Sequence, residues 1–154
     1  MCIDQCQSVA VRGLIRRGGT ILVEYLPNHS IAFLPGGRVE PGETLKETLI
    51  RELKEELAHF DFEIGSYLGK IACFWERAGV AGSCLNHFFE VRILPATDCR
   101  QIEAAEPGHL FKWLALEGGE GEMLRPKVLP SLIGDHFDGA MTMWDLIDRQ
   151  NEDF

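Results

Sequence analysis

Apolar and β-branched residues recur in short runs along the chain, and turn-forming residues separate these runs. Gly18-Gly19 stands between two such runs, SVAVRGLIRR and TILVEYL, and is typical of a hairpin turn. Pro27-Asn28-His29 ends the second run, and Pro35-Gly36-Gly37 ends the next one. A later pair of runs predicts a second hairpin around the loop RAGVAGS. The predicted strands are 8–17, 20–26, 31–34, 62–76, 84–94 and 109–116.

The segment after Pro35-Gly36-Gly37 has the period of an amphipathic helix. Thr44, followed three residues later by Glu47, forms a capping-box pattern that places the start of the helix at Thr44. Leucines then recur every four residues and give the helix one apolar stripe. The stripe consists of Leu45, Leu49, Leu53 and Leu57. One side of this helix is therefore expected to pack on the sheet.

Two further segments predict helical structure. A helix is expected over 125–137, with Pro130 limiting its regularity. The tail MTMWDLIDRQNEDF is expected to form one or two more amphipathic turns, in which Met141, Trp144 and Ile147 share a face. We interpret that face as a surface that packs on the domain or on a second copy in a homodimer. Strands mixed with two helical regions predict an α/β fold in which helices cover both faces of a mixed sheet.

Length and composition fit one globular domain. The 154 residues are 45% hydrophobic and 25% charged, and these values exclude wholesale disorder. A chain of this length buries one substantial core and leaves little room for a second domain. We therefore expect a single domain over residues 1–154, with residues 1–6 frayed and 138–154 forming a C-terminal tail or helix.

Charge, hydropathy and cysteines limit the classes of function. A net charge of −9 argues against binding of extended nucleic acid, which needs a basic surface, and means that metal ions must help to hold any phosphates. Neither a signal-peptide pattern nor an apolar run of about 18 residues is found, so no membrane association is expected. The five cysteines lack a CxxC pattern, which favours reduced thiols in a cytoplasmic protein.

Three carboxylates gather on the predicted helix. Glu52, Glu55 and Glu56 lie within an arc of about 100° and within about one turn of rise. Like charges this close repel one another, so they either form a solvated acidic face or bind a cation. The carbonyl groups of Gly36 and Gly37 in the preceding turn could add further oxygen ligands. Oxygen-rich, negatively charged clusters of this kind suit Mg²⁺ or Mn²⁺, which also bind phosphates.

The whole segment resembles the Nudix box, the signature of the Nudix hydrolase family. It reads Gly37, five residues, Glu43, seven residues, and then RELKEE from Arg51 to Glu56. The resemblance implies a Nudix-like α/β/α sandwich with a mixed sheet. It also implies a pyrophosphohydrolase that uses Mg²⁺ or Mn²⁺ to cleave a nucleoside diphosphate linked to another moiety X. The substrate would be a small nucleotide, of the nucleoside triphosphate or nucleotide sugar class.

The resemblance further implies roles for individual residues. The implied metal ligands are Glu52, Glu55 and Glu56, with a carbonyl from Gly36 or Gly37. In the catalytic set, Glu52 would lie closest to the attacking water, and Arg51 would pair with Glu43 and fix the loop against the helix. A second acid often comes from another part of such chains. The candidates for this second acid are Glu103, Glu106 and Glu90.

The sequence departs from the Nudix pattern at the end of the box, where Ala58 and His59 replace a glycine and an aliphatic residue. Two geometries are open there: the helix ends in a left-handed cap at Ala58, or it continues toward His59.

The substrate is also open, and so is the alternative of a Nudix-fold module that binds or senses a nucleotide without cleaving it. Intact box glutamates favour the hydrolase, because a binding module does not need them. One aromatic side chain of the second hairpin could stack on a base. The candidates are Phe74, Trp75, Phe88 and Phe89.

Overall fold

The structure, a computed structural model, describes residues 6–57, 60–94, 110–139 and 143–149. The strands are β1 (Cys6–Arg17), β2 (Thr20–Leu26), β3 (Ile31–Phe33), β4 (Gly36–Arg38), β5 (Phe62–Arg77), β6 (Val80–Ile93), β7 (Leu110–Ala115), β8 (Leu124–Arg125) and β9 (Trp144–Arg149). The helices are α1 (Leu45–Glu56) and α2 (Leu129–Phe137), and a short 3-10 helix covers Glu120–Met123.

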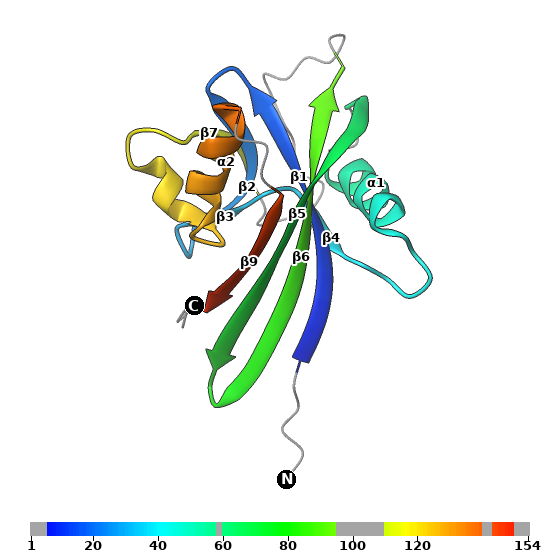
Figure 1. The fold of residues 1–154 in the computed structure, drawn as a ribbon, viewed down its shortest axis with the longest axis vertical. Coiled ribbons are helices and arrows are strands. Elements are labelled where there is room, and N and C mark those ends of the chain that lie inside the picture. The colour runs from blue at the N-terminus through cyan, green and yellow to red at the C-terminus, as the bar shows by residue number, and fades with distance from the viewer. Residues whose placement is uncertain (1–5, 58–59, 95–109, 140–142, 150–154) are drawn as a thin grey trace.

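A curled mixed sheet joins the described strands (Figure 1). Its order is β8-β3-β2-β1-β6-β5-β9, with β4 also paired to β1 and β7 also paired to β2. The pairs β1–β6, β3–β8 and β5–β9 are parallel, whereas the other pairs are antiparallel. The mixed sheet expected from the sequence is therefore confirmed.

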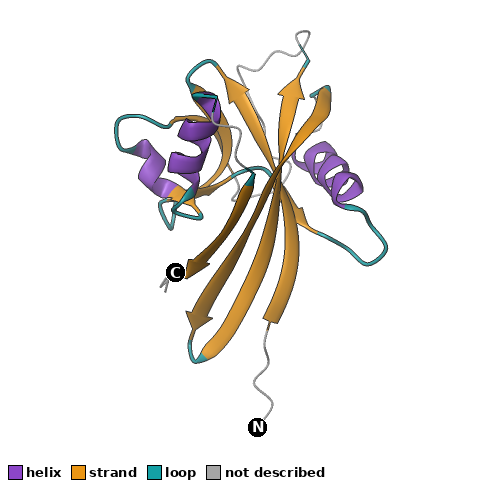
Figure 2. Ribbon diagram, in the orientation of Figure 1, coloured by secondary structure: helices purple, strands orange, loops and turns teal. Residues whose placement is uncertain are grey.

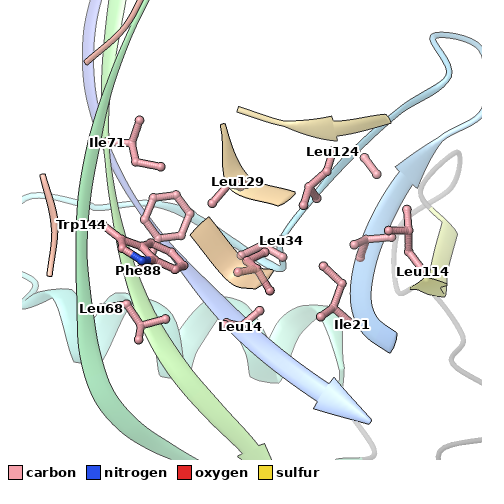
Figure 3. Packing of buried hydrophobic residues seen from close by; sticks show 13 residues of the cluster. Leu14, Ile21, Leu34, Leu68, Ile71, Phe88, Leu114, Leu124, Leu129 and Trp144 are labelled. Carbon is pink, nitrogen blue, oxygen red and sulfur yellow. The ribbon is translucent and has the colours of Figure 1, made fainter. Parts of the chain in front are cut away.

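The two helices lie on opposite sides of the sheet (Figure 2). α1 buries Leu49 and Leu53 in a core that also contains Phe89. α2 buries its apolar side in a second and larger core, where the ring centroids of Phe88 and Trp144 lie 5.5 Å apart (Figure 3). This arrangement confirms the expected α/β/α layers. Neither described helix has the length and apolar character needed to cross a membrane.

α1 begins where the capping box predicted. The Thr44 hydroxyl accepts a hydrogen bond from the Glu47 backbone N–H at 3.2 Å, and the Glu47 carboxylate accepts one from the Thr44 N–H at 2.9 Å. The helix is capped at Leu57, whose N–H donates to the Leu53 carbonyl at 2.7 Å. The alternative in which the helix continues toward His59 is therefore wrong, because α1 ends at Glu56. Ala58 and His59 lie outside the described residues, so a left-handed cap at Ala58 stays a prediction.

Gly36 and Gly37 were expected to form a turn, but they belong to β4, which pairs antiparallel with β1. A Cβ on Gly36 would lie 2.0 Å from the Val11 carbonyl oxygen, and the φ of Gly36 is +146°. Only glycine allows this conformation and this close approach. The pairing fixes the backbone of β4 beside α1.

The second hairpin is tighter than expected, because β6 begins at Val80 instead of Cys84. Its turn consists of Ala78 and Gly79, with φ values of +50° and +78°. Positive φ at both central residues matches a turn whose twist fits the flanking strands. Most of the predicted loop RAGVAGS is therefore strand.

α2 begins at Leu129, later than the expected start at residue 125. Pro130 lies in the first turn of the helix. Proline is tolerated there, because the first N–H groups of a helix have no partner within it. Pro130 therefore marks the start of α2 and does not disturb its interior.

The expectation of a helical tail is wrong, because residues 144–149 form β9, which lies parallel to β5. Trp144 is 5% exposed, whereas Ile147 is 62% exposed. Successive side chains of a strand point to opposite faces, so residues three apart cannot share a face. Pairing with the edge of β5 supplies backbone hydrogen bonds to a segment too short for a stable isolated helix. Met141 lies outside the described residues.

Two substitutions test the strand geometry of β9. Trp144→Ala removes a buried ring and is expected to lower the free energy of unfolding by about 3 kcal/mol or more. Ile147→Ala removes an exposed side chain, and its effect is expected to stay below about 0.5 kcal/mol. Urea denaturation measures both values. Equal losses for the two variants would indicate the shared helical face and contradict the strand.

Candidate active site

The carboxylates of Glu52 and Glu56 lie against the backbone of β4. The Gly36 N–H donates to Glu56 Oε2 at 3.2 Å. A Cβ on Gly37 would lie 2.3 Å from Glu52 Cδ, so a side chain there would displace the carboxylate. The two glutamates are four residues apart and therefore neighbours on α1. Helix and strand together bring these four predicted residues into one site.

Arg51 holds the loop before α1 against the helix. Its Nε donates to Glu43 Oε1 at 2.6 Å, and its Nη2 donates to Glu43 Oε2 at 2.9 Å. The Thr48 hydroxyl donates to the same carboxylate at 2.8 Å. The hydrogen bond from Arg51 is the main cause that lowers the pKa of Glu43 to about 2. The expected pair of Arg51 and Glu43 is confirmed, and its two-point contact fixes the direction of the guanidinium.

The same guanidinium reaches two acids of the cluster. Arg51 Nη1 donates to Glu52 Oε1 at 2.9 Å and lies 3.7 Å from Glu55 Oε1. The Glu55 side chain is 60% exposed, so it lies on the outer side of the cluster. Within the described part of the chain, no three His, Cys, Asp or Glu side chains already converge as a metal centre. The assignment of Glu52, Glu55 and Glu56 as metal ligands therefore stays a proposal.

Glu56 is the acid whose ionisation is most perturbed. Burial raises its pKa to about 8, the charges of Glu24 and Glu52 add to the increase, and the charge of Arg12 opposes it. Glu56 therefore carries a proton at neutral pH in the metal-free protein. A bound cation would stabilise the ionised form and release that proton.

Glu24 is a candidate that the sequence analysis missed. It lies on β2 and is 8% exposed. It follows Leu22 by two positions, and Leu22 packs in the core of α1, so both side chains point toward the helix. The signal was a carboxylate at an inward-facing position of the apolar run TILVEYL, because a buried glutamate is rare without a partner. The sequence alone did not show which face of this strand meets the helix.

The structure contains an aromatic pocket of about 180 Å³. Phe74, Trp75 and Phe88 line it, together with Phe33 from β3. Three of the four expected stacking candidates therefore line this pocket. The fourth, Phe89, packs in the core of α1 instead.

Arg12, on β1, connects the pocket with the acidic residues. It lines the pocket, and its Cζ lies 5.7 Å from the ring centroid of Phe33. Its Nη1 donates to the carbonyl oxygens of Leu34 and Gly36, both at 3.2 Å. Its charge also acts on Glu56. The guanidinium of Arg12 therefore contributes both to the aromatic pocket and to the charge around Glu56. Nothing in the sequence distinguished Arg12 from the neighbouring basic residues.

Of the three candidates for the second acid, the structure describes only Glu90. The Glu90 carboxylate is hydrogen-bonded to His136 of α2. Glu90 therefore points to the side of the sheet that α2 covers, and the structure does not bring it together with the acids of α1. Glu103 and Glu106 lie outside the described residues, so their assignment stays a prediction.

Comparison with known proteins identifies the family. A family model of the NUDIX domain matches residues 7–125, and the chain belongs to this family. This membership confirms the expectation of a Nudix pyrophosphohydrolase. A comparison with curated proteins found no match.

Solved structures agree with this membership at the level of the fold. A NUDIX hydrolase from Nitrosomonas europaea is 22% identical, with a TM-score of 0.65 over 90% of this chain and 94% of that chain. A mutator MutT protein from Bacillus halodurans is 15% identical, with a TM-score of 0.64 over 96% and 92%. An ADP-ribose pyrophosphatase from Streptococcus suis is 15% identical, with a TM-score of 0.56 over 92% and 98%.

The raised pKa of Glu56 predicts how stability changes with pH. Between the ordinary pKa of 4.5 and the folded-state pKa of about 8, the folded protein keeps a proton that the unfolded chain has released. The free energy of unfolding of the metal-free protein should therefore fall as pH rises through this range, by up to about 1.4 kcal/mol per pH unit from this residue. Urea denaturation in EDTA at several pH values measures the slope.

Glu56→Gln should flatten this slope, because an amide does not titrate. Glu47→Gln is the matched control on the same helix, and it should keep the slope of the unmodified protein. An identical slope in Glu56→Gln and in the unmodified protein would contradict the assignment of the proton to Glu56.

Proposed function

We propose that this Nudix protein is a metal-dependent hydrolase that cleaves the diphosphate bond of a nucleoside diphosphate linked to a second moiety X. One observation carries the proposal: Glu52 and Glu56 lie on the backbone of β4, and Arg12, whose charge acts on Glu56, also lines the aromatic pocket. A flat base suits the aromatic pocket, and a diphosphate held by a cation suits the acids. The link that Arg12 makes between the pocket and the acids therefore supports a nucleotide substrate.

The donor atoms suit Mg²⁺ or Mn²⁺. Glu52, Glu55 and Glu56 offer carboxylate oxygens, and Gly36 and Gly37 offer backbone carbonyls beside them. All of these are hard oxygen ligands, which both ions prefer. When bound, such an ion neutralises the diphosphate and lowers the pKa of a water molecule that attacks phosphorus.

The side chains of the chain itself would position the reactants. Arg51 holds Glu52 and Glu43 in fixed directions, which keeps the acids of α1 in place. Arg12 lies at the boundary of the pocket and the acids, where its guanidinium can bind phosphate oxygens. Fixed charges of this kind supply most of the rate in phosphoryl transfer, because little covalent chemistry is left to the protein.

Glu24 would supply the second acid. It is buried on the side of β2 that faces α1, and its charge already acts on Glu56. Glu24 and Glu56 together would hold a cation more tightly than either alone, and Glu24 would be placed to accept a proton. This assignment fills the role for which the sequence analysis considered Glu90, Glu103 and Glu106.

The substrate class remains that of nucleoside triphosphates and nucleotide sugars. The ADP-ribose pyrophosphatase from Streptococcus suis shares this fold, and ADP-ribose is a nucleoside diphosphate linked to a sugar. A panel of nucleotides incubated with Mg²⁺ or Mn²⁺ tests the function. Phosphate is measured directly and again after phosphatase treatment. The first reading detects inorganic phosphate that the enzyme releases, and the second also detects phosphate from nucleoside monophosphate or other phosphorylated products. Nucleotide binding without turnover on any metal would support the binding module instead.

Glutamine substitutions at the box glutamates test the acids without changing side-chain shape. Glu52→Gln and Glu56→Gln should each lower kcat by a factor on the order of 10² or more, because each removes charge that stabilises the transition state. Steady-state kinetics on the best substrate of the panel measure the effect. Glu47→Gln is the control, since glutamine also completes a capping box, and it should leave kcat nearly unchanged. Full turnover in Glu52→Gln and Glu56→Gln would show that the acids form a solvated face.

Glu24→Gln tests the second acid. It should lower kcat by about tenfold or more and weaken Mn²⁺ binding, because a carboxylate close to the metal ligands is lost. Kinetics measure the first effect, and calorimetric titration with Mn²⁺ measures the second without any substrate. Glu63→Gln, an exposed acid that pairs with Arg92, is the matched control. Unchanged Mn²⁺ affinity in Glu24→Gln would remove Glu24 from the site.

A further inference from the structure

Two cysteines face each other across β5 and β6. Cys73 and Cys84 are register partners in this antiparallel pair, so their side chains point to the same face of the sheet. Both line the aromatic pocket, and both are half-buried thiols. The wall of the pocket thus contains a pair of thiols that neither the Nudix box nor the proposed hydrolysis uses.

The Cα spacing of this pair fits a disulfide, and the two Cβ atoms, about 4.5 to 5.5 Å apart in opposite residues, must approach by about 1 Å to reach the spacing of a disulfide. Opposite residues of antiparallel strands have Cα atoms about 4.5 to 5.5 Å apart. Disulfides join Cα atoms that are about 4.4 to 6.8 Å apart, and this range includes the spacing of the strands. The Asn86 side-chain amide donates to Cys73 Sγ at 3.5 Å and keeps the sulfur on the pocket side of the sheet.

A role for these thiols in metal binding has less support. Asp148 of β9 is the register partner of Cys73 on its other side and also lines the pocket. Even so, in the described ranges no group of three His, Cys, Asp or Glu side chains is arranged to hold a metal ion. The pair is therefore suited to covalent chemistry between its own two sulfur atoms.

We propose that Cys73 and Cys84 are a redox modification site, at which a low-molecular-weight disulfide oxidises both thiols to a bridge between β5 and β6. The thiolate of one cysteine attacks the small disulfide, releases one small thiol and forms a mixed disulfide. The thiolate of the other cysteine attacks the protein sulfur of this mixed disulfide and releases the second small thiol. Two electrons pass from the cysteines to the reagent, and their two protons are carried by the released thiols.

The bridge alters the pocket, and this consequence rests on the proposed function. It replaces two separate thiols in the wall by one fixed S–S bond and withdraws the Cys73 sulfur from its contact with Asn86. We expect the oxidised protein to bind nucleotide measurably more weakly, because the fixed S–S bond changes the shape of the pocket wall. Reduction of the bridge should restore the affinity.

Peptide mapping tests the modification directly. A variant in which Cys2, Cys6 and Cys99 are replaced by serine isolates the pair. Treatment of this folded variant with oxidised glutathione should produce a cross-linked peptide that contains Cys73 and Cys84 and disappears after reduction. The same background with Cys84→Ser is the matched control and should carry only a glutathione adduct. Adducts without a cross-link, or no reaction at either sulfur, would overturn the proposal.

Calorimetry with ADP, GDP and UDP then tests the effect on the pocket. The cross-linked and the re-reduced protein are compared as one sample in two states, so that any effect of the serine substitutions cancels. Weaker binding after cross-linking supports the proposal, and equal affinities overturn the effect on the pocket. Absence of binding to the reduced protein would contradict the proposed nucleotide function, whereas the peptide map would still decide whether the bridge forms.

Discussion

The site depends on the close approach of α1 to β4. The Glu52 carboxylate fills the space that a side chain on Gly37 would occupy, and the Gly36 N–H binds Glu56. β4 reaches this position because Gly36 lies against the carbonyl oxygen of Val11, where no side chain fits. The buried leucines of α1 fix the rotation of the helix, so the acids beside them meet the strand. Packing therefore sets the place of the acids before any ligand binds.

This packing concentrates negative charge that the neighbouring cations only partly balance. Arg51 binds Glu43 and Glu52 on one side, and the charge of Arg12 acts on Glu56 from the other. Burial, and after it the charges of Glu24 and Glu52, raise the pKa of Glu56 to about 8, and protonation of Glu56 relieves part of the repulsion. A carboxyl group that is protonated for this reason gives up its proton when a cation arrives. The burial of Glu56 among other acids thus explains why a cation would be favoured at this place.

The residues of α1 were predictable from the sequence, because helical periodicity alone places them. The capping box and the leucine stripe located Arg51 and Glu52 correctly on the helix. Residues that reach the site through strand pairing were not predictable in this way. Glu24 and Arg12 belong to it only because β2 and β1 present particular faces, and Glu90 points away for the same reason. β9 was mistaken for a helix because a short edge strand has too few residues to show its period.

Anomalous diffraction from crystals grown with Mn²⁺ tests most directly whether the contact of α1 and β4 builds a metal site. The account predicts an anomalous peak bound by the carboxylates of Glu52 and Glu56 and by a carbonyl of Gly36 or Gly37. With a nucleotide present, the diphosphate should lie between this peak and Arg12. An anomalous peak confined to other surface carboxylates, or no peak beside β4 at millimolar Mn²⁺, would contradict the account.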